Sequence, residues 1–333
     1  MFFQHIANAY AIDLGTNNTL VYAPNKGIVL DEPTSIAFDS IRQAFFGSGV
    51  SAHQIAGKNP KHIEVMNPLS QGAITNLNVA KAYIKEVIRR ISHHRWFKPI
   101  IVVSVPSDLS SLERNAVIEA AKEGGARDVL LIKDPFSAAL GSKCAIENPE
   151  GVLVLDMGAG VTEISLLSCN GLVMSKSIRI AGNDIDQAIM EYFKNHKRIL
   201  MSSRDAETLK KSLGDMLKNS TQSRAINVKN LITRMPESYE VHAHDVRLAI
   251  RPIADKIVAL THAMLSSLPP SFASDVYDGG IILTGGTSML YGIEEYLSSQ
   301  LDIAIVPAQS PLHTIVLGAG RAIEEKSSHL FGI

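Results

Sequence analysis

Two short turns carry the residues whose types and spacing could bind a phosphate group. Each has the pattern Asp-x-Gly-x-x-x-Thr, from Asp13 to Thr19 and again from Asp156 to Thr162. Glycine in such a turn lets backbone N–H groups converge on phosphate oxygens without interference from a Cβ atom, and the hydroxyls of Thr16, Thr19 and Thr162 could donate further hydrogen bonds. Two such turns facing each other would clamp a triphosphate from both sides.

Asp13 and Asp156 each open one of these turns and could serve a metal ion that accompanies the phosphates. Mg²⁺ keeps several of its waters and favours carboxylate oxygens close to phosphate groups. We therefore expect both aspartates to act on Mg²⁺ through water rather than by direct ligation.

A third glycine turn, Gly285-Gly286-Thr287-Ser288-Met289, lies near the end of the chain. It follows an apolar run at 280–284 and precedes a helical pattern from about residue 293 to 301, so its backbone could approach a base or a sugar closely. This arrangement suits the adenosine end of a nucleotide. Each turn alone is also compatible with an ordinary hairpin, and it is the combination of three turns that favours a nucleotide site.

The surroundings of the first two turns indicate an internal repeat that positions them. In each copy a strand, a glycine turn, a strand, a second turn and a third strand follow in order, over residues 11–30 and 152–174. Strands alternating with amphipathic helices indicate an α/β fold. The hydrophobic pattern predicts strands at 100–105, 129–132 and 280–284, and helices at 79–91, 110–123, 185–193, 205–213, 243–268 and 293–301. Pro269-Pro270 is expected to stop the helix before it, and four prolines between residues 24 and 68 suggest a small, loop-rich insertion.

Composition and charge exclude several classes of function. Lys+Arg number 32 against 33 Asp+Glu, so the basic footprint of a nucleic-acid-binding protein is missing and we expect no nucleic-acid partner. Cys144 and Cys169 are too few for a disulfide framework and lack zinc spacing. No apolar run of about 18 residues occurs, and the first ten residues lack the basic segment of a secretion signal, so we expect a cytoplasmic protein. The basic run at 194–198 is expected to be a helix end that faces water.

The segment Asp-Leu-Gly-Thr-Asn-Asn-Thr at 13–19 resembles the first phosphate motif of the actin, Hsp70 and sugar-kinase superfamily, in its MreB form. Segments at 27–33, 113–114, 125–129, 155–160, 179–182 and 283–286 also resemble MreB sequences, in the same order. The resemblance implies an actin-like (ribonuclease H-like) fold, with two similar α/β domains flanking a nucleotide cleft and a smaller subdomain in each. Domain I would span 1–140, with a C-terminal helix 314–333 packing back and a small subdomain at about 33–66. Domain II would span 141–313, with a small subdomain at about 181–242.

The resemblance also implies which residues bind ATP. They comprise the three turns and one helix: Asp13, Gly15, Thr16, Asn17, Asn18, Thr19, Asp156, Gly158, Ala159, Gly160, Val161, Thr162, Glu207, Thr208, Leu209, Lys210, Gly285, Gly286, Thr287, Ser288 and Met289. For Glu207 and Lys210, a solvated helix face is the alternative. Ser212, Ala181 and Asn183 depart from the residues usual in the family, and these departures concern which nucleotide is preferred rather than nucleotide binding itself.

Two further departures affect the positions that, in the family, orient the attacking water. A glutamate before proline is replaced here by Asp134, and a threonine in the second turn is replaced by Val161. Asp134 keeps a carboxylate but is one methylene shorter, which withdraws it by roughly 1.5 Å. Val161 keeps the shape of threonine without its hydroxyl. We expect ATP binding to persist and ATP hydrolysis to be slow or nearly absent.

Two apolar segments could contact a membrane. Phe2 and Phe3 lie in an uncharged apolar stretch, which is either a disordered or packed terminus or an interfacial anchor. Trp96 and Phe97 lie in an expected loop with cations on both sides and look like the membrane-insertion loop of the MreB family, the alternative being that they cap the core.

Taken together, these features favour an MreB-like cytoskeletal protein. The resemblance implies a homopolymer of paired protofilaments that binds ATP and Mg²⁺, lies peripherally on the cytoplasmic face of the cell membrane, and meets other cytoskeletal or cell-envelope proteins. Two alternatives stay open: a scaffold filament locked on its nucleotide without significant ATPase activity, and a monomeric phosphotransferase. The phosphotransferase would need a substrate-binding insertion, and none is evident in this compact chain.

Overall fold

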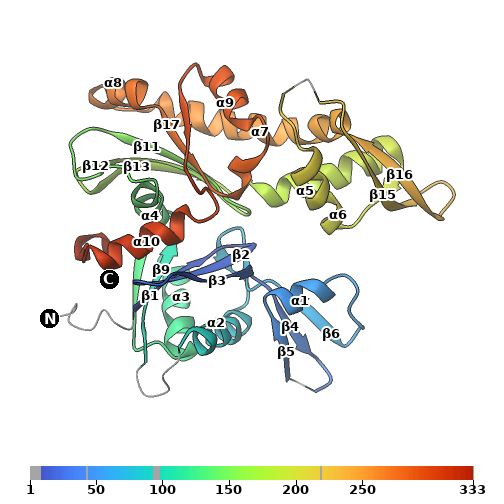
Figure 1. Ribbon diagram of the computed structural model, residues 1–333, viewed down its shortest axis with the longest axis horizontal. Coiled ribbons are helices and arrows are strands. Elements are labelled where there is room, and N and C mark those ends of the chain that lie inside the picture. The colour runs from blue at the N-terminus through green and yellow to red at the C-terminus, as the bar shows by residue number, and fades with distance from the viewer. Residues whose placement is uncertain (1–8, 43, 93–97, 218–219, 333) are drawn as a thin grey trace. The chain divides into compact units, whose positions relative to one another are not determined.

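The computed structural model describes residues 9–42, 44–92, 98–217 and 220–332, and its strands and helices alternate as an α/β fold requires (Figure 1). The chain forms two compact units. The first consists of Met1–Val154, Ser165–Ser175 and Ala308–Ile333, and the second of Leu155–Ile164 and Lys176–Pro307. The predicted domain boundaries at about 140 and 313 stay predictions.

A six-stranded sheet carries the first phosphate-type turn. Its strands are β1 (Ala9–Leu14), β2 (Asn18–Ala23), β3 (Gly27–Pro33), β9 (Ile100–Val105), β10 (Asp128–Lys133) and β19 (Phe331–Gly332). Their order in the sheet is β19-β10-β9-β1-β2-β3. β1 is antiparallel to β2 and parallel to β9, so Asp13 pairs with Leu20 on one side and with Ser104 on the other. All of these strands except β19 were predicted from the sequence, and they are confirmed.

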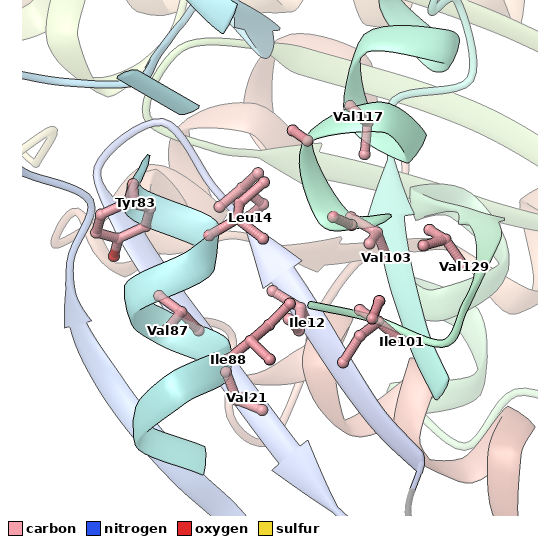
Figure 2. Close-up of a cluster of buried hydrophobic side chains, with 14 of the residues drawn as sticks. Ile12, Leu14, Val21, Tyr83, Val87, Ile88, Ile101, Val103, Val117 and Val129 are labelled. Carbon is pink, nitrogen blue, oxygen red and sulfur yellow. The ribbon is translucent and has the colours of Figure 1, made fainter. Parts of the chain in front are cut away.

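Two amphipathic helices, α2 (Leu77–Ile91) and α3 (Ser111–Gly124), pack with this sheet around a common core. Both begin at a polar cap: the Asn76 side chain accepts two backbone N–H bonds from α2, and Ser110 and Glu113 form a reciprocal capping box on α3. Figure 2 shows apolar side chains of α2 lying against those of β1, β2 and β9, namely Tyr83, Val87, Ile88, Ile12, Leu14, Val21, Ile101 and Val103. Both predicted helices are confirmed.

An ion pair ties β3 to α2 at the edge of this core. The two guanidinium NH groups of Arg90 donate to the two carboxylate oxygens of Glu32, one of them at 2.7 Å, and the Tyr83 hydroxyl donates to Glu32 at 3.4 Å. The Glu32 side chain is 7% exposed and that of Arg90 is 29% exposed. Removing one partner of a buried pair leaves the other charge uncompensated.

We expect Arg90→Ala to lower the free energy of unfolding by about 3 kcal/mol, the low end of the range for broken buried pairs because Arg90 retains some solvent contact. Arg89→Ala is the matched control: Arg89 is 70% exposed and pairs with Glu86 within the same helix, so it should change stability by less than about 0.5 kcal/mol. Urea unfolding of both variants checks this. Equal effects would show that the Glu32 pair contributes nothing beyond a surface pair.

Residues 33–66 are more regular than the sequence suggested. They contain the strands β4 (Ile36–Asp39), β5 (Ala44–Ser48) and β6 (Ile63–Met66), which pair in the order β5-β4-β6, and the short helix α1 (Val50–Ile55). The expectation of a loop-rich insertion is wrong because strands of four or five residues are too short to show a clear period. A two-stranded ribbon of β7 (Leu69–Ser70) and β8 (Ala73–Ile74) follows.

The C-terminal helix is shorter than predicted. Helix α10 (Thr314–Glu324) packs on helix α4 (Asp134–Gly141) and ends well before residue 333. Lys326 has φ +55°, its N–H donates to the Ile323 carbonyl, and the Ser327 N–H donates to the Ala322 carbonyl, which is the pairing that closes a helix with a left-handed residue. The short η4 (Ser328–Leu330) then leads into β19, which pairs with β10.

The second phosphate-type turn lies in a five-stranded sheet. Its strands are β11 (Val152–Met157), β12 (Thr162–Ser168), β13 (Gly171–Ile178), β17 (Ile281–Thr284) and β18 (Ile305–Pro307), in the order β13-β12-β11-β17-β18. Cys169 and Asn170, between β12 and β13, have φ of +49° and +57°, as a tight hairpin turn requires. The predicted repeat of three strands around two turns is confirmed in both places.

Helices and one small sheet complete the second unit. They are α5 (Gly182–Tyr192), the π-helical η2 (Phe193–Lys197), β14 (Ile199–Leu200), α6 (Ser203–Leu213), β15 (Ser223–Asn230), β16 (Pro236–His242), α7 (Ala243–Leu265), α8 (Pro270–Gly279), the 3₁₀ η3 (Gly286–Met289) and α9 (Ile293–Leu301). Helix α8 was missed because Pro269-Pro270 was interpreted only as a stop, whereas Pro270 occupies the first turn of a new helix. No helix among the described residues is both long enough and apolar enough to cross a membrane.

Candidate functional site

The first turn of the candidate site joins β1 to β2 and is held by a network of threonines. The Thr34 hydroxyl donates to the Gly15 carbonyl at 2.8 Å, and the Thr34 N–H donates to the Asn17 carbonyl at 2.8 Å. The Thr16 hydroxyl accepts the N–H of Gly72 at 3.2 Å. Neighbouring segments therefore fix the path of the backbone between Asp13 and Thr19.

The hydroxyl of Thr19 supports the turn itself. It lies 2.8 Å from the Thr34 hydroxyl, and because Thr34 gives its single proton to Gly15, Thr19 must be the donor in this pair. The Thr162 hydroxyl likewise donates to the Ile180 carbonyl at 2.7 Å, and both threonines are fully buried. In this structure both hydroxyls bond to protein oxygens, and the prediction that they donate to phosphate stays a prediction.

Asp13 is the penultimate residue of β1, and burial of its carboxyl group raises the pKa of that group to about 7. A carboxyl group whose pKa lies near neutral pH loses its proton readily when a cation approaches, because the opposite charge favours the ionised form. A raised pKa is compatible with a group that meets a positive charge, and the role of Asp13 beside Mg²⁺ stays a prediction.

Three segments of the second unit meet at the carbonyl group of Gly158. Its oxygen accepts the Thr287 hydroxyl at 2.6 Å and the Gly182 N–H at 3.2 Å. The Asn183 N–H donates to the Ala159 carbonyl at 2.8 Å, and the Gly158 N–H closes the turn onto the Val161 carbonyl at 3.0 Å. The structure thus brings together two of the predicted turns, at 156–162 and 285–289, with the start of α5.

The turn after β17 approaches β11 backbone to backbone. Gly285 has φ +86°, and a Cβ atom on it would lie 2.4 Å from both Asp156 Oδ1 and the Met157 carbonyl oxygen. Only glycine fits this position, because a side chain would meet backbone atoms and a carboxylate at less than contact distance. Ser288 closes the turn by donating its hydroxyl to the Gly285 carbonyl at 2.6 Å, and Met289 is 60% exposed beside it.

Helix α6, which carries the predicted residues 207–210, is anchored to α5 by one of them. Lys210 Nζ donates to the Gly182 carbonyl at 2.9 Å and pairs with Asp186 at 2.9 Å, which anchors α6 to the start of α5. Burial raises the pKa of Asp186 to about 6, although Lys210 opposes the shift. Glu207 pairs with Lys211 along the helix and Thr208 bonds to the Arg204 carbonyl. Leu209 has no exposed surface and is part of the core, and its predicted contact with a ligand stays a prediction.

Asp134 and Val161, which were predicted to occupy the water-positioning places, are both half buried. Asp134 begins α4, where its negative charge is favoured by the helix dipole, and Val161 lies in the second turn between Gly158 and β12. The four predicted membrane residues, Phe2, Phe3, Trp96 and Phe97, lie outside the described residues. Among the described residues, no group of three His, Cys, Asp or Glu side chains could hold a metal ion.

Sequence reasoning missed Gly182 and the Thr287 hydroxyl as parts that organise the site. The signal for Gly182 was its place between a predicted strand and a predicted helix, where a backbone N–H is available to a neighbouring turn. No sequence signal marks Thr287 as the partner of a carbonyl 129 positions away.

We expect Thr287→Val to lower the free energy of unfolding by about 1 kcal/mol, because the isosteric change removes one of the two donors to a partly buried carbonyl. Thr287→Ser should restore most of the loss. Thr208→Val is the control, since the Thr208 hydroxyl bonds only to its own helix at an exposed position. Thermal and urea unfolding measure all three, and a Thr287→Val protein as stable as Thr208→Val would contradict the role of this bond.

The sequence matches the MreB/Mbl protein family over residues 7–330. The chain belongs to this family. It is 32% identical over 320 residues to the cell shape-determining protein Mbl of Bacillus cereus (strain ATCC 10987 / NRS 248), covering 96% of each chain.

Solved structures agree with membership of the MreB/Mbl family. The structure matches the crystal structure of MreB 5 of Spiroplasma citri bound to AMPPNP with a TM-score of 0.91 and 28% identity, over 97% of each chain. The same protein bound to ADP also gives a TM-score of 0.91, over 97% of this chain and 98% of the other. A MamK double helical filament chain matches with a TM-score of 0.80 at 19% identity, over 95% and 99% of the two chains, and bears on the fold alone. The actin-like fold predicted from the sequence is confirmed.

Proposed function

We propose that this MreB/Mbl-family chain binds ATP together with Mg²⁺ and polymerises into filaments on the cytoplasmic face of a membrane, where it serves cell shape or intracellular organisation. Membership of a family of cell shape-determining proteins supports the cytoskeletal role. The binding of AMPPNP and of ADP by MreB 5 of Spiroplasma citri supports nucleotide binding.

The observation that carries the nucleotide proposal is the meeting of three segments at the Gly158 carbonyl, with Gly285 against Asp156. Two glycine turns that pack together in this way leave their backbone groups open to close approach by a ligand. Recognition of a phosphate or a sugar by the backbone requires such close approach. In this proposal the turns at 15–19 and 158–162 bind phosphate, and 286–289 bind the adenosine end.

The residues present also fit Mg²⁺. Asp13 and Asp156 offer carboxylates at the openings of the two turns, and the raised pKa of Asp13 would fall again beside a divalent cation. When bound beside the phosphates, Mg²⁺ would neutralise part of their negative charge. Asp13 and Asp156 would orient its waters through hydrogen bonds.

Sedimentation with ATP, ADP and a non-hydrolysable analogue, together with phosphate release, tests the proposed function. We expect nucleotide-dependent pelleting that EDTA reduces, with slow phosphate release. Filaments without any phosphate release would favour the nucleotide-locked scaffold. A protein that stays monomeric with every nucleotide would contradict the filament proposal and favour the phosphotransferase.

If Asp134 and Val161 slow ATP hydrolysis, restoring the residues usual in the family should raise its rate. We expect the double variant Asp134→Glu, Val161→Thr to hydrolyse ATP on the order of 10- to 100-fold faster than wild type in single turnover, because it restores the carboxylate reach and the hydroxyl that orient water. Asp134→Asn is the control that removes the charge without changing the length. A wild type as fast as the double variant would show that another group orients the water.

A further inference from the structure

Two buried serine hydroxyls join strand β9 to helix α4. Ser104 Oγ and Ser137 Oγ are 3.3 Å apart, and the two residues are 5% and 0% exposed. Ser104 belongs to β9 and Ser137 to α4, so the pair connects the six-stranded sheet to the helix that begins at Asp134. Buried hydroxyls need a partner, and each of these serines supplies one for the other.

The sheet register places Ser104 beside Asp13. β1 and β9 are parallel, and Ser104 is the residue of β9 that pairs with Asp13. Paired residues of neighbouring strands point to the same face of a sheet, and successive residues of one strand alternate between faces. Ile12, Leu14 and Val103 point toward α2 (Figure 2). Asp13 and Ser104 therefore point to the opposite face, on which α4 and α10 pack.

The other end of the serine pair leads to Asp134. Ser137 follows Asp134 by three residues, so the two lie in the first turn of α4 and on neighbouring positions of its surface. Ser104 also pairs in register with Ile132, close to the point where β10 passes into α4. The carboxyl ends of parallel strands meet at one edge of a sheet, so Asp13, the serine pair and Asp134 follow one another along that edge.

Helix α10 supports α4 from its other side. Arg321 donates to the Leu140 carbonyl at 2.7 Å, and Gly141 approaches the Thr314 carbonyl closely. These contacts fix α4 relative to α10, whereas the serine pair fixes it relative to β9. Because the bond between the two hydroxyls is long, we expect its removal to affect the position of α4 more than the free energy of unfolding.

We propose that Ser104 and Ser137 are positioning residues for ATP hydrolysis: their hydroxyl pair fixes the first turn of α4, and with it the Asp134 carboxylate, relative to Asp13. This inference rests on the proposed function, in which Asp13 serves Mg²⁺ and Asp134 orients the attacking water. Two carboxylates that act on one reaction from different elements must be held at a fixed separation, because a small displacement of either lowers the rate strongly. Neither serine contacts the nucleotide in this proposal, so ATP binding does not depend on the pair.

Single-turnover ATP hydrolysis and fluorescent-nucleotide titration test this role. We expect Ser104→Ala and Ser137→Ala each to lower the hydrolysis rate about three- to ten-fold and to change ATP affinity by less than about two-fold. The double variant should be no slower than either single variant, because both changes remove the same bond. Ser104→Thr keeps the hydroxyl on a residue type that suits a strand, and should retain most of the wild-type rate. The same changes in Asp134→Glu, Val161→Thr protein give the comparison in a faster background.

Ser168→Ala is the matched control. It removes another buried serine hydroxyl, which donates to the Pro149 carbonyl at 2.8 Å at the end of β12 that is distant from the second turn. This variant should lose at least as much stability as Ser104→Ala and keep the wild-type hydrolysis rate. If Ser168→Ala slows hydrolysis as much as Ser104→Ala does, the effect is a general loss of stability and the proposal is overturned.

Hydrogen exchange measures the positioning of α4 without hydrolysis. Ser104→Ala leaves the sequence of α4 unchanged, so faster amide exchange in a peptide covering 134–141 reports a looser helix directly. We expect exchange about two- to five-fold faster in Ser104→Ala and unchanged in Ser168→Ala. Exchange in α4 that Ser104→Ala leaves unaltered would overturn the proposal, whatever the hydrolysis rates are.

The outcomes separate this inference from the proposed function. If the wild type releases phosphate and the serine variants release it equally fast, the pair has no positioning role and the proposed function stands. If neither the wild type nor Asp134→Glu, Val161→Thr protein binds ATP, the proposed nucleotide binding fails and the role of the pair fails with it. If both bind ATP and neither releases phosphate, the nucleotide-locked scaffold is favoured and the positioning role is overturned.

Discussion

Gly318→Ala is expected to destabilise the first unit by about 3 kcal/mol or more, at the upper end of what overpacking costs. A Cβ atom at this position of α10 would lie 1.7 Å from the carbonyl oxygen of Ser137 in α4, and one on Gly141 would lie 2.0 Å from the Thr314 carbonyl oxygen. The two helices therefore cross with their backbones in contact. Because backbone atoms cannot rotate away as a side chain can, the extra methyl must push the helices apart.

Urea unfolding and thermal unfolding measure this effect. Gly279→Ala is the matched control, since its Cβ would meet no atom within 4 Å and Gly279 lies at the exposed end of α8. That change should be neutral or raise stability by up to about 1 kcal/mol, as helical alanine does relative to glycine. A Gly318→Ala protein as stable as Gly279→Ala would mean that α4 and α10 separate without loss.

The substitution should also affect ATP hydrolysis, because α4 begins at Asp134. A helix that moves to accept a methyl group on Gly318 takes the Asp134 carboxylate with it. In any Gly318→Ala protein that remains folded, we expect the rate of ATP hydrolysis to change more than the affinity for ATP. The contact between α4 and α10 at Gly141 and Gly318 thus links packing in the first unit to Asp134, the residue proposed to weaken hydrolysis.

Gly285→Ala is expected to combine a stability loss of about 3 kcal/mol with a fall in ATP affinity of about ten-fold or more. The alanine would have to adopt φ +86° and place its methyl group 2.4 Å from Asp156 Oδ1 and from the Met157 carbonyl oxygen. Relief of this clash moves the turn at 285–289 away from β11. The proposed phosphate turn and the proposed adenosine turn would then no longer be held together.

Gly27→Ala separates the two contributions. Gly27 also has a left-handed φ, +76°, but a Cβ there would meet nothing within 4 Å. This control should cost only the conformational strain, about 1–2 kcal/mol, and leave ATP affinity unchanged. Fluorescent-nucleotide titration and urea unfolding of both variants decide the matter. Equal losses of stability and of ATP affinity in the two variants would show that the close approach of Gly285 to β11 has no special importance.

Much of the fold was predictable because the strands and helices of the repeat have clear local patterns of apolar and polar residues. Period-2 and period-3.6 runs located β1 to β3, β9, β10, α2 and α3. Patterns failed where the elements were short, as in β4 to β6, or where one residue type has two meanings. Pro270 starts a helix, although a proline pair also ends one.

The candidate site divides in the same way. The glycine turns at 15–19, 158–162 and 285–289 were visible because glycine and aspartate at fixed spacing are local features. The uses of Thr19 and Thr162 were not visible, because whether a hydroxyl meets a ligand or a backbone carbonyl depends on partners such as Thr34 and Ile180. The same is true of Lys210, whose partner Asp186 lies in another helix.

The sequence by itself determined the three turns, the repeat that carries them and the family. Each of these depends on residue type and spacing along the chain. Only the tertiary structure decided that Thr287 and Gly182 meet at the Gly158 carbonyl and that α4 and α10 touch through glycines. Contacts between distant residues are set by how the layers pack, and packing tolerates so little free space that one methyl group decides which backbones can meet.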